Sequence, residues 1–141
     1  MIYISGIEYK DIDKVWDCCV PFLELGNDKS QNEMTVDDIY NMCCSQEMQL
    51  WIIHDEDRNI YGAGITQIIL YPNKSVCRII TLGGKDFDDW TDTINTIEEW
   101  ARNQDCESLE MWCRKGFQRK LTDYGYKQRY TVLGKDISTI H

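Results

Sequence analysis

The amino-acid sequence predicts a mixed α/β fold, in which one mixed sheet carries helices on both faces. Three patterns indicate it: two segments with apolar residues at helical spacing near the start, three short apolar runs separated by polar turns in the middle, and alternating helix and strand patterns toward the end. The predicted order is β-α-α-β-β-β-α-β-α-β. Because the chain has 141 residues, 43% of them hydrophobic, we expect a single domain over residues 1–141.

The first third of the chain predicts an edge strand and two helices. Residues 1–6 alternate weakly between apolar and polar side chains. The first helix, which Asp11 would cap and which Pro21 would end nearby, has apolar residues one turn apart at Ile12, Val15, Trp16 and Cys19. Thr35 would cap the second helix, which has the same spacing at Val36, Ile39, Tyr40 and Cys43.

The middle of the chain predicts an antiparallel meander of strands over residues 50–53, 60–70 and 76–82. Glycines at positions 62 and 64 suggest a bulge in the second of these strands. A long helix over residues 88–103 would then cross to a strand over residues 109–113, which we expect to lie parallel to the third.

The end of the chain predicts a short helix, stopped by Gly125, and a last strand over residues 126–133. We expect nine residues of the whole pattern to be buried: Trp16, Ile39, Trp51, Ile79, Ile94, Ile97, Met111, Phe117 and Leu121.

Composition narrows the possible functions. The chain has 15 Lys and Arg against 24 Asp and Glu, a formal net charge of −9, which argues against a general nucleic-acid binder. No apolar run approaches the roughly 18 residues of a membrane span, and no secretion signal is visible, so we expect a cytoplasmic protein. The seven cysteines form no Cys-x-x-Cys pair and only two histidines are present. We therefore expect reduced thiols and no metal site.

The predicted order, together with three stretches of sequence, resembles the Gcn5-related N-acetyltransferase (GNAT) superfamily over nearly the whole chain. The stretches are residues 50–53, residues 60–64, and residues 121–126 running into residues 130–135. The pattern is most similar to small acetyltransferase-like proteins of tailed bacteriophages, including internal virion core proteins. The resemblance implies an acetyl-CoA cofactor, whose pantetheine arm pairs with the backbone of the fourth strand and whose pyrophosphate lies at the following turn. It assigns cofactor contacts to Ile80, Thr81, Leu82, Gly83, Gly84 and Lys85, with Arg114 or Arg119 reaching a phosphate.

Other residues depart from the family pattern. Asp86, Asp88 and Asp89 follow the two glycines and would repel a pyrophosphate, although acids are also ordinary residues at a helix start. Arg114 and Leu121 stand where the family often has an asparagine and the tyrosine that protonates the departing thiolate. The candidate catalytic groups are then Glu110 as a base and Tyr124 as an acid. The alternatives are a solvated strand position for Glu110 and a packing role for Tyr124.

Three functions remain open at this point. The chain is an N-acetyltransferase with a degenerate cofactor loop that acts on an amine, a non-catalytic bacteriophage virion or assembly protein, or a small regulator that binds a host protein. The partner would be an amine acceptor or a virion or host protein, with a homo-oligomer as a further option, in the host cytoplasm or the virion. Six Lys and Arg within residues 114–129 would either meet the 3′-phosphate of CoA, a nucleic-acid backbone or an acidic partner, or balance the chain's own acids.

Overall fold

The computed structural model describes residues 2–27, 34–85, 93–113 and 115–138. They form two compact units, residues 1–111 and 112–141, and each unit is described by itself. The expectation of a single domain stays a prediction.

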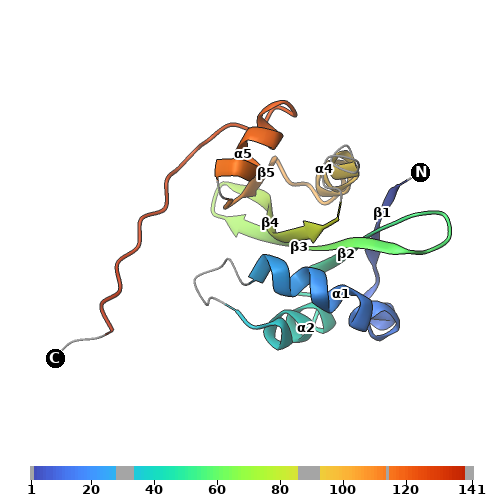
Figure 1. The fold of residues 1–141 in the computed structure, drawn as a ribbon. Helices are drawn as coiled ribbons and strands as arrows, with labels where there is room; N and C mark the ends of the chain where they lie inside the picture. Colours follow the sequence, from blue (N-terminus) through green and yellow to red (C-terminus); the bar gives the residue numbers. More distant parts are fainter. Residues whose placement is uncertain (1, 28–33, 86–92, 114, 139–141) are drawn as a thin grey trace. The chain divides into compact units, whose positions relative to one another are not determined.

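The first unit is built on a five-stranded mixed sheet in the order β1-β2-β3-β4-β5 (Figure 1). The strands are β1 (Tyr3–Ile7), β2 (Gln49–His54), β3 (Ile60–Tyr71), β4 (Lys74–Gly84) and β5 (Ser108–Met111). The pairs β1–β2, β2–β3 and β3–β4 are antiparallel, whereas β4–β5 is parallel. The predicted edge strand, meander and parallel fourth pair are confirmed.

Helices cover both faces of this sheet (Figure 1). A 3₁₀ turn (Tyr9–Asp11) leads into α1 (Ile12–Asn27), and α1 and α2 (Val36–Cys44) share one hydrophobic cluster with residues of β2 and β3. On the other face lies α4 (Ile94–Asn103), where Trp100 packs edge-on against Trp51 with ring centroids 5.3 Å apart. The first part of the predicted helix over residues 88–103 lies outside the described residues.

Local sequence explains where α2 begins but not where α1 ends. Thr35 accepts a hydrogen bond from the Asp38 amide, and Asp38 accepts one from the Thr35 amide, so the predicted cap is a full capping box. The expectation that Pro21 ends the first helix is wrong, because α1 continues to Asn27. Proline removes one backbone hydrogen bond there, but Cys19, Phe22 and Leu23 on either side of it are buried, and this packing holds the helix together.

The predicted core is largely confirmed. Trp16 and Met111 are only half-buried, and the side chain of Phe117 lies outside the described residues. The other six residues of the prediction are buried: Ile39, Trp51, Ile79, Ile94, Ile97 and Leu121.

The second unit contains α5 (Lys115–Thr122) and the extended segment that follows it. Gly125 has a φ of 89°, the left-handed conformation expected after the helix. The predicted strand over residues 126–133 does not form. A strand needs a neighbour to complete its hydrogen bonds, and no ladder in the described chain includes this segment.

Candidate functional site

The end of β4 extends beyond its parallel neighbour. The β4–β5 pairing runs from Val76 opposite Ser108 to Ile79 opposite Met111, and β4 continues to Gly84. Of the residues 80–84 that follow, residues 81–84 pair with β3 on one edge, and β5 does not reach the other edge of any of them. These are the residues that the sequence analysis assigned to a cofactor.

A β-bulge lies at the point where β5 ends. Ile79 lies opposite Thr66 and Thr81 lies opposite Ile65, so Ile80 is an extra residue on β4. Ile80 packs against the cluster beneath α1 and α2, to which Ile65 also belongs. A bulge bends its strand and increases the local twist, and this bulge lies where the β4–β5 pairing stops.

The hydrogen-bond pattern fixes which backbone groups face the open edge. The Lys85 amide donates to the Tyr61 carbonyl oxygen at 2.8 Å. Because bonded and non-bonded pairs alternate along an antiparallel ladder, Thr81 and Gly83 share the orientation of Lys85 toward β3. Leu82 and Gly84 then direct their N–H and C=O groups to the edge that β5 leaves open.

Two glycines on β3 allow β4 to approach closely here. A Cβ at Gly62 would lie 2.7 Å from the Gly83 carbonyl oxygen, and a Cβ at Gly64 would lie 2.6 Å from the Leu82 side chain. The bulge expected near these glycines occurs in β3 at Tyr61, where the pairing with β2 skips a residue. The glycines themselves serve as contact points for the end of β4.

The β2–β3 turn supports Tyr61, and through it Lys85. The Tyr61 hydroxyl donates to the Asp55 carboxylate at 3.0 Å. Asp55 also accepts from the amide and side chain of Asn59 and from the Asp57 amide. These donors, the Asn59 side chain foremost, lower the pKa of Asp55 to about 2. The turn is thus a closed set of hydrogen bonds around one ionised carboxylate.

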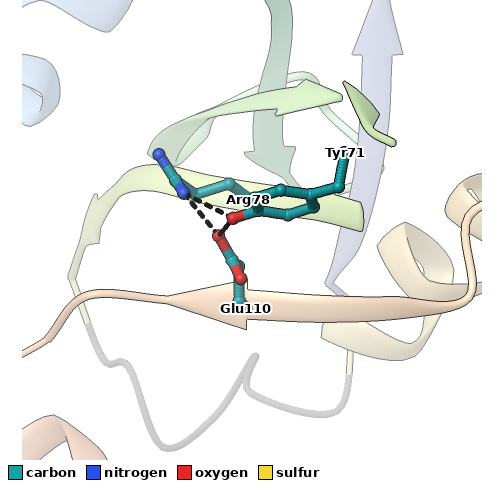
Figure 2. Close-up of polar contacts among 3 residues, drawn as sticks. All are labelled: Tyr71, Arg78 and Glu110. Atoms are coloured by element: carbon teal, nitrogen blue, oxygen red, sulfur yellow. Dashed lines mark hydrogen bonds and ion pairs between the residues drawn. The ribbon is translucent and has the colours of Figure 1, made fainter. Parts of the chain in front are cut away.

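Glu110, the candidate base, is held in an ion pair on the paired part of β5 (Figure 2). Its Oε1 lies 2.6 Å from Arg78 Nη2 and 2.7 Å from Arg78 Nε, and the Tyr71 hydroxyl lies near both partners. The Arg78 and Glu110 side chains are only 20% and 14% exposed. Since Arg78 and Glu110 are register partners of the parallel ladder, the pair links β4 to β5 just before the two strands part.

The remaining candidates belong to the second unit or lie outside the described residues. Arg114 is outside them. Arg119 lies on α5 and is exposed, and Tyr124 follows α5 and is 38% exposed. The structure therefore places residues 80–84 at the end of β4, with Lys85 directly after them. Glu110 lies on the neighbouring strand β5, opposite Arg78. Arg119 and Tyr124 belong to the second unit.

Neither the thiols nor the acids suggest another chemistry. All seven cysteines are free, and burial raises the pKa of Cys19, Cys43 and Cys77 to about 12, so these three stay protonated. Among the residues that the structure describes, no group of three or more His, Cys, Asp or Glu could hold a metal ion. None of the described helices is long and apolar enough to cross a membrane.

Sequence reasoning missed Arg78, Tyr71 and Tyr61. A signal for the first was available, because Arg78 is a lone charge inside an apolar strand that was expected to lie beside the strand of Glu110. The hydrogen bond between Lys85 and Tyr61 joins backbone atoms of both residues, so no pattern of side chains in the sequence predicts it.

Comparison with solved structures identifies the fold. An aminoglycoside acetyltransferase from an uncultured soil metagenomic sample, in complex with sisomicin, is 10% identical, with a TM-score of 0.70 over 97% of each chain. Glucosamine-6-phosphate N-acetyltransferase from Arabidopsis thaliana is 11% identical, with a TM-score of 0.66 over 98% of this chain and 99% of that one. A predicted acetyltransferase with acetyl-CoA from Clostridium acetobutylicum is 13% identical, with a TM-score of 0.69 over 96% of each chain.

The chain has the GNAT fold. The GNAT resemblance drawn from the sequence is confirmed at this level. No protein-family model and no curated protein matches the sequence. The identities of 10–13% are low enough that the likeness concerns the fold, and the activity has to be argued from the site.

Proposed function

We propose that the protein binds acetyl-CoA along the open edge of β4 and transfers its acetyl group to an amine. The observation that supports this is the parting of β4 and β5 after Ile79 and Met111, at the bulge formed by Ile80. An edge with outward N–H and C=O groups two residues apart, at Leu82 and Gly84, suits a linear ligand that carries amide groups of its own.

The residues present fit such a cofactor in two ways. The backbone edge of residues 80–84 matches the two amides of a pantetheine arm, and the exposed cation of Lys85 follows directly where a diphosphate would lie. Acetyl-CoA, when bound, supplies a reactive thioester. The chain then contributes positioning above all, since holding an amine beside that thioester removes much of the entropic barrier.

The acid and base roles have less support than the binding role. Glu110 is paired with Arg78, and this ion pair occupies one of its carboxylate oxygens. Leu121 cannot donate a proton where the family often has a tyrosine. We therefore expect slow transfer to an amine that arrives already neutral.

Two alternatives carry over from the sequence: a non-catalytic bacteriophage virion or assembly protein, and a regulator that binds a host protein. Either would keep the GNAT fold without acetyl-CoA binding. The acidic residues after Lys85, which motivate these alternatives, lie outside the described residues. The binding experiment below separates them from the enzyme.

Isothermal titration of the protein with acetyl-CoA tests the proposal, with Lys85→Ala as the variant and Lys74→Ala as its matched control. Both lysines are exposed, and they lie at opposite ends of β4. We expect saturable binding that Lys85→Ala weakens about tenfold, the effect of losing one charge-assisted contact, while Lys74→Ala leaves it unchanged. An absence of binding at millimolar acetyl-CoA, or equal losses in both variants, would contradict the proposal.

A further inference from the structure

Ser5 on β1 and His54 at the end of β2 form a hydrogen-bonded pair away from the candidate cofactor edge. Ser5 Oγ lies 2.9 Å from His54 Nε2, and the other ring nitrogen, Nδ1, lies 2.9 Å from the Asp55 carbonyl oxygen. A carbonyl oxygen can only accept, so Nδ1 carries the ring proton and donates it. In the neutral ring Nε2 then holds a lone pair, and the Ser5 hydroxyl donates to it. An activated serine requires these same contacts: a hydroxyl, an imidazole and a group that orients the imidazole.

The surroundings of His54 hold its ring in this orientation. Tyr3 is the register partner of His54 on β1, and the two rings lie at a tilt with their centroids 5.8 Å apart. The carbonyl that orients the ring belongs to Asp55, whose carboxylate accepts hydrogen bonds from the backbone of its own turn and from Tyr61. The β2–β3 turn therefore fixes the position of that carbonyl, and a fixed acceptor fixes the imidazole that donates to it.

The strand that carries Ser5 also offers backbone donors beside the hydroxyl. Both Ser5 and His54 are half-buried, so the pair is accessible from the surface. Within the described chain, β1 is the first strand of the sheet and pairs only with β2. Its outer edge therefore directs alternate amides away from the sheet, either that of Ser5 itself or those of Ile4 and Gly6. In both cases an N–H donor lies within one residue of the Ser5 hydroxyl, where it can stabilise an oxyanion.

We propose that Ser5 and His54 are the nucleophile and the general base of a second site, which cleaves small acyl esters without acetyl-CoA. Ser5 Oγ attacks the ester carbonyl carbon, and the hydroxyl proton passes to His54 Nε2. The ester C–O bond then breaks, and the departing alkoxide takes the proton from Nε2 and leaves as an alcohol. Water attacks the acyl-serine and gives one proton to Nε2. Ser5 takes that proton back as the carboxylic acid leaves.

Hydrolysis of p-nitrophenyl acetate, followed by the absorbance of p-nitrophenolate, tests this pair. We expect the wild-type chain to hydrolyse the ester, and Ser5→Ala and His54→Gln each to lower the rate about hundredfold. The double variant should be no slower than either single variant, because the two side chains act as a unit. The matched control is Ser45→Ala, since the Ser45 hydroxyl donates to the Met42 carbonyl oxygen at 3.2 Å rather than to an imidazole. It should leave the rate unchanged.

A fluorophosphonate probe gives a second readout on the wild-type chain, which needs no variant to fold. Its phosphorus bonds to the oxygen of an activated serine and releases fluoride. Peptide mapping by mass spectrometry should find the label on Ser5 and not on Ser45.

Three results would overturn the proposal. The wild-type chain could show neither hydrolysis nor label, which would make the Ser5–His54 contact purely structural. The label could spread equally over other serines. Ser5→Ala could leave the hydrolysis rate unchanged, which would mean that the His54 imidazole reacts alone. Since neither experiment contains acetyl-CoA, these failures are distinct from a failure of the proposed acetyl transfer.

Discussion

At the residue scale, Gly62 marks the closest backbone approach at the candidate cofactor edge. A Cβ there would lie 2.7 Å from the Gly83 carbonyl oxygen and 3.2 Å from Gly84 Cα. Since both contacts are backbone atoms, Gly62→Ala should displace the end of β4 and lower the free energy of unfolding by about 1–3 kcal/mol. Urea denaturation measures the loss, and acetyl-CoA affinity should fall with it.

The matched control for this change is Gly6→Ala on β1. Its Cβ would meet the Gln49 side chain at 3.4 Å and the Trp51 ring at 3.5 Å, which are ordinary contacts. We expect this variant to be as stable as the wild type or slightly more so, because alanine restricts the unfolded chain. Equal effects of the two substitutions would mean that the close approach to β4 is unimportant.

Also at the residue scale, the Arg78–Glu110 pair should contribute to stability. Glu110→Gln keeps the size of the side chain but removes the charge that faces a largely buried guanidinium, so we expect a loss of about 2 kcal/mol. Glu99→Gln removes the same charge from the pair with Arg102, in which both side chains are about two-thirds exposed, and should change stability by less than about 0.5 kcal/mol. Thermal unfolding of the three proteins compares these effects.

If Glu110 is instead only a catalytic base, Glu110→Gln would lower the acetyl-transfer rate and leave the unfolding temperature unchanged. That outcome would contradict the structural role that we assign to the pair.

At the element scale, α2 depends on its capping box. Thr35→Ala removes the oxygen that accepts from the Asp38 amide, and we expect a loss of about 1 kcal/mol in the free energy of unfolding. The hydrogen bond from the Thr35 amide lowers the pKa of Asp38. Asp38 therefore stabilises the fold above its unfolded pKa of about 3.9, and this contribution disappears as the pH falls through the lower folded value.

Denaturant unfolding as a function of pH checks this sign. The stability difference between the wild type and Asp38→Asn should be constant near neutral pH and shrink as the solution becomes strongly acidic. A difference that grows on acidification would contradict the assignment of the cap.

Elements with a strong local signal were predictable. The capped, periodic helix at Thr35 and the meander with its polar turns follow from short-range chemistry, and the structure has them. The helix end predicted near Pro21 was wrong because proline affects only the local backbone. The burial of Phe22 and Leu23, which sustains α1, depends on the tertiary structure. The strand predicted over residues 126–133 was wrong because residues with a high strand propensity form a strand only when a neighbouring strand pairs with them.

The candidate site was predictable only in part. Residues 80–85 were proposed as cofactor contacts through a family resemblance, and the structure places residues 80–84 at the end of β4 with Lys85 directly after them. The bulge at Ile80 depends on the register between β3 and β4. The sequence pattern of one strand does not specify this register. The partner of Glu110 was hidden for the same reason, since Arg78 meets it only through the parallel register.

At the scale of the whole molecule, the central feature is a mixed sheet whose two parallel strands, β4 and β5, stop pairing after Ile79 and Met111 and leave a backbone edge on β4. The fold is shared with known acetyltransferases, but a fold hosts many functions. The open edge distinguishes particular backbone amides. Those of Leu82 and Gly84 point away from β3, whereas those of Thr81 and Gly83 bond to it. Binding of acetyl-CoA at this edge can therefore be tested at each of these amides separately.

Amide hydrogen exchange at single-residue resolution, with and without acetyl-CoA, tests it most directly. We predict that the amides of Leu82 and Gly84 exchange quickly in the free protein and become protected when acetyl-CoA is added. The amides of Thr81 and Gly83, already bonded to β3, should change little. Protection that is unchanged at Leu82 and Gly84 under saturating acetyl-CoA, or that appears only elsewhere in the chain, would contradict the account.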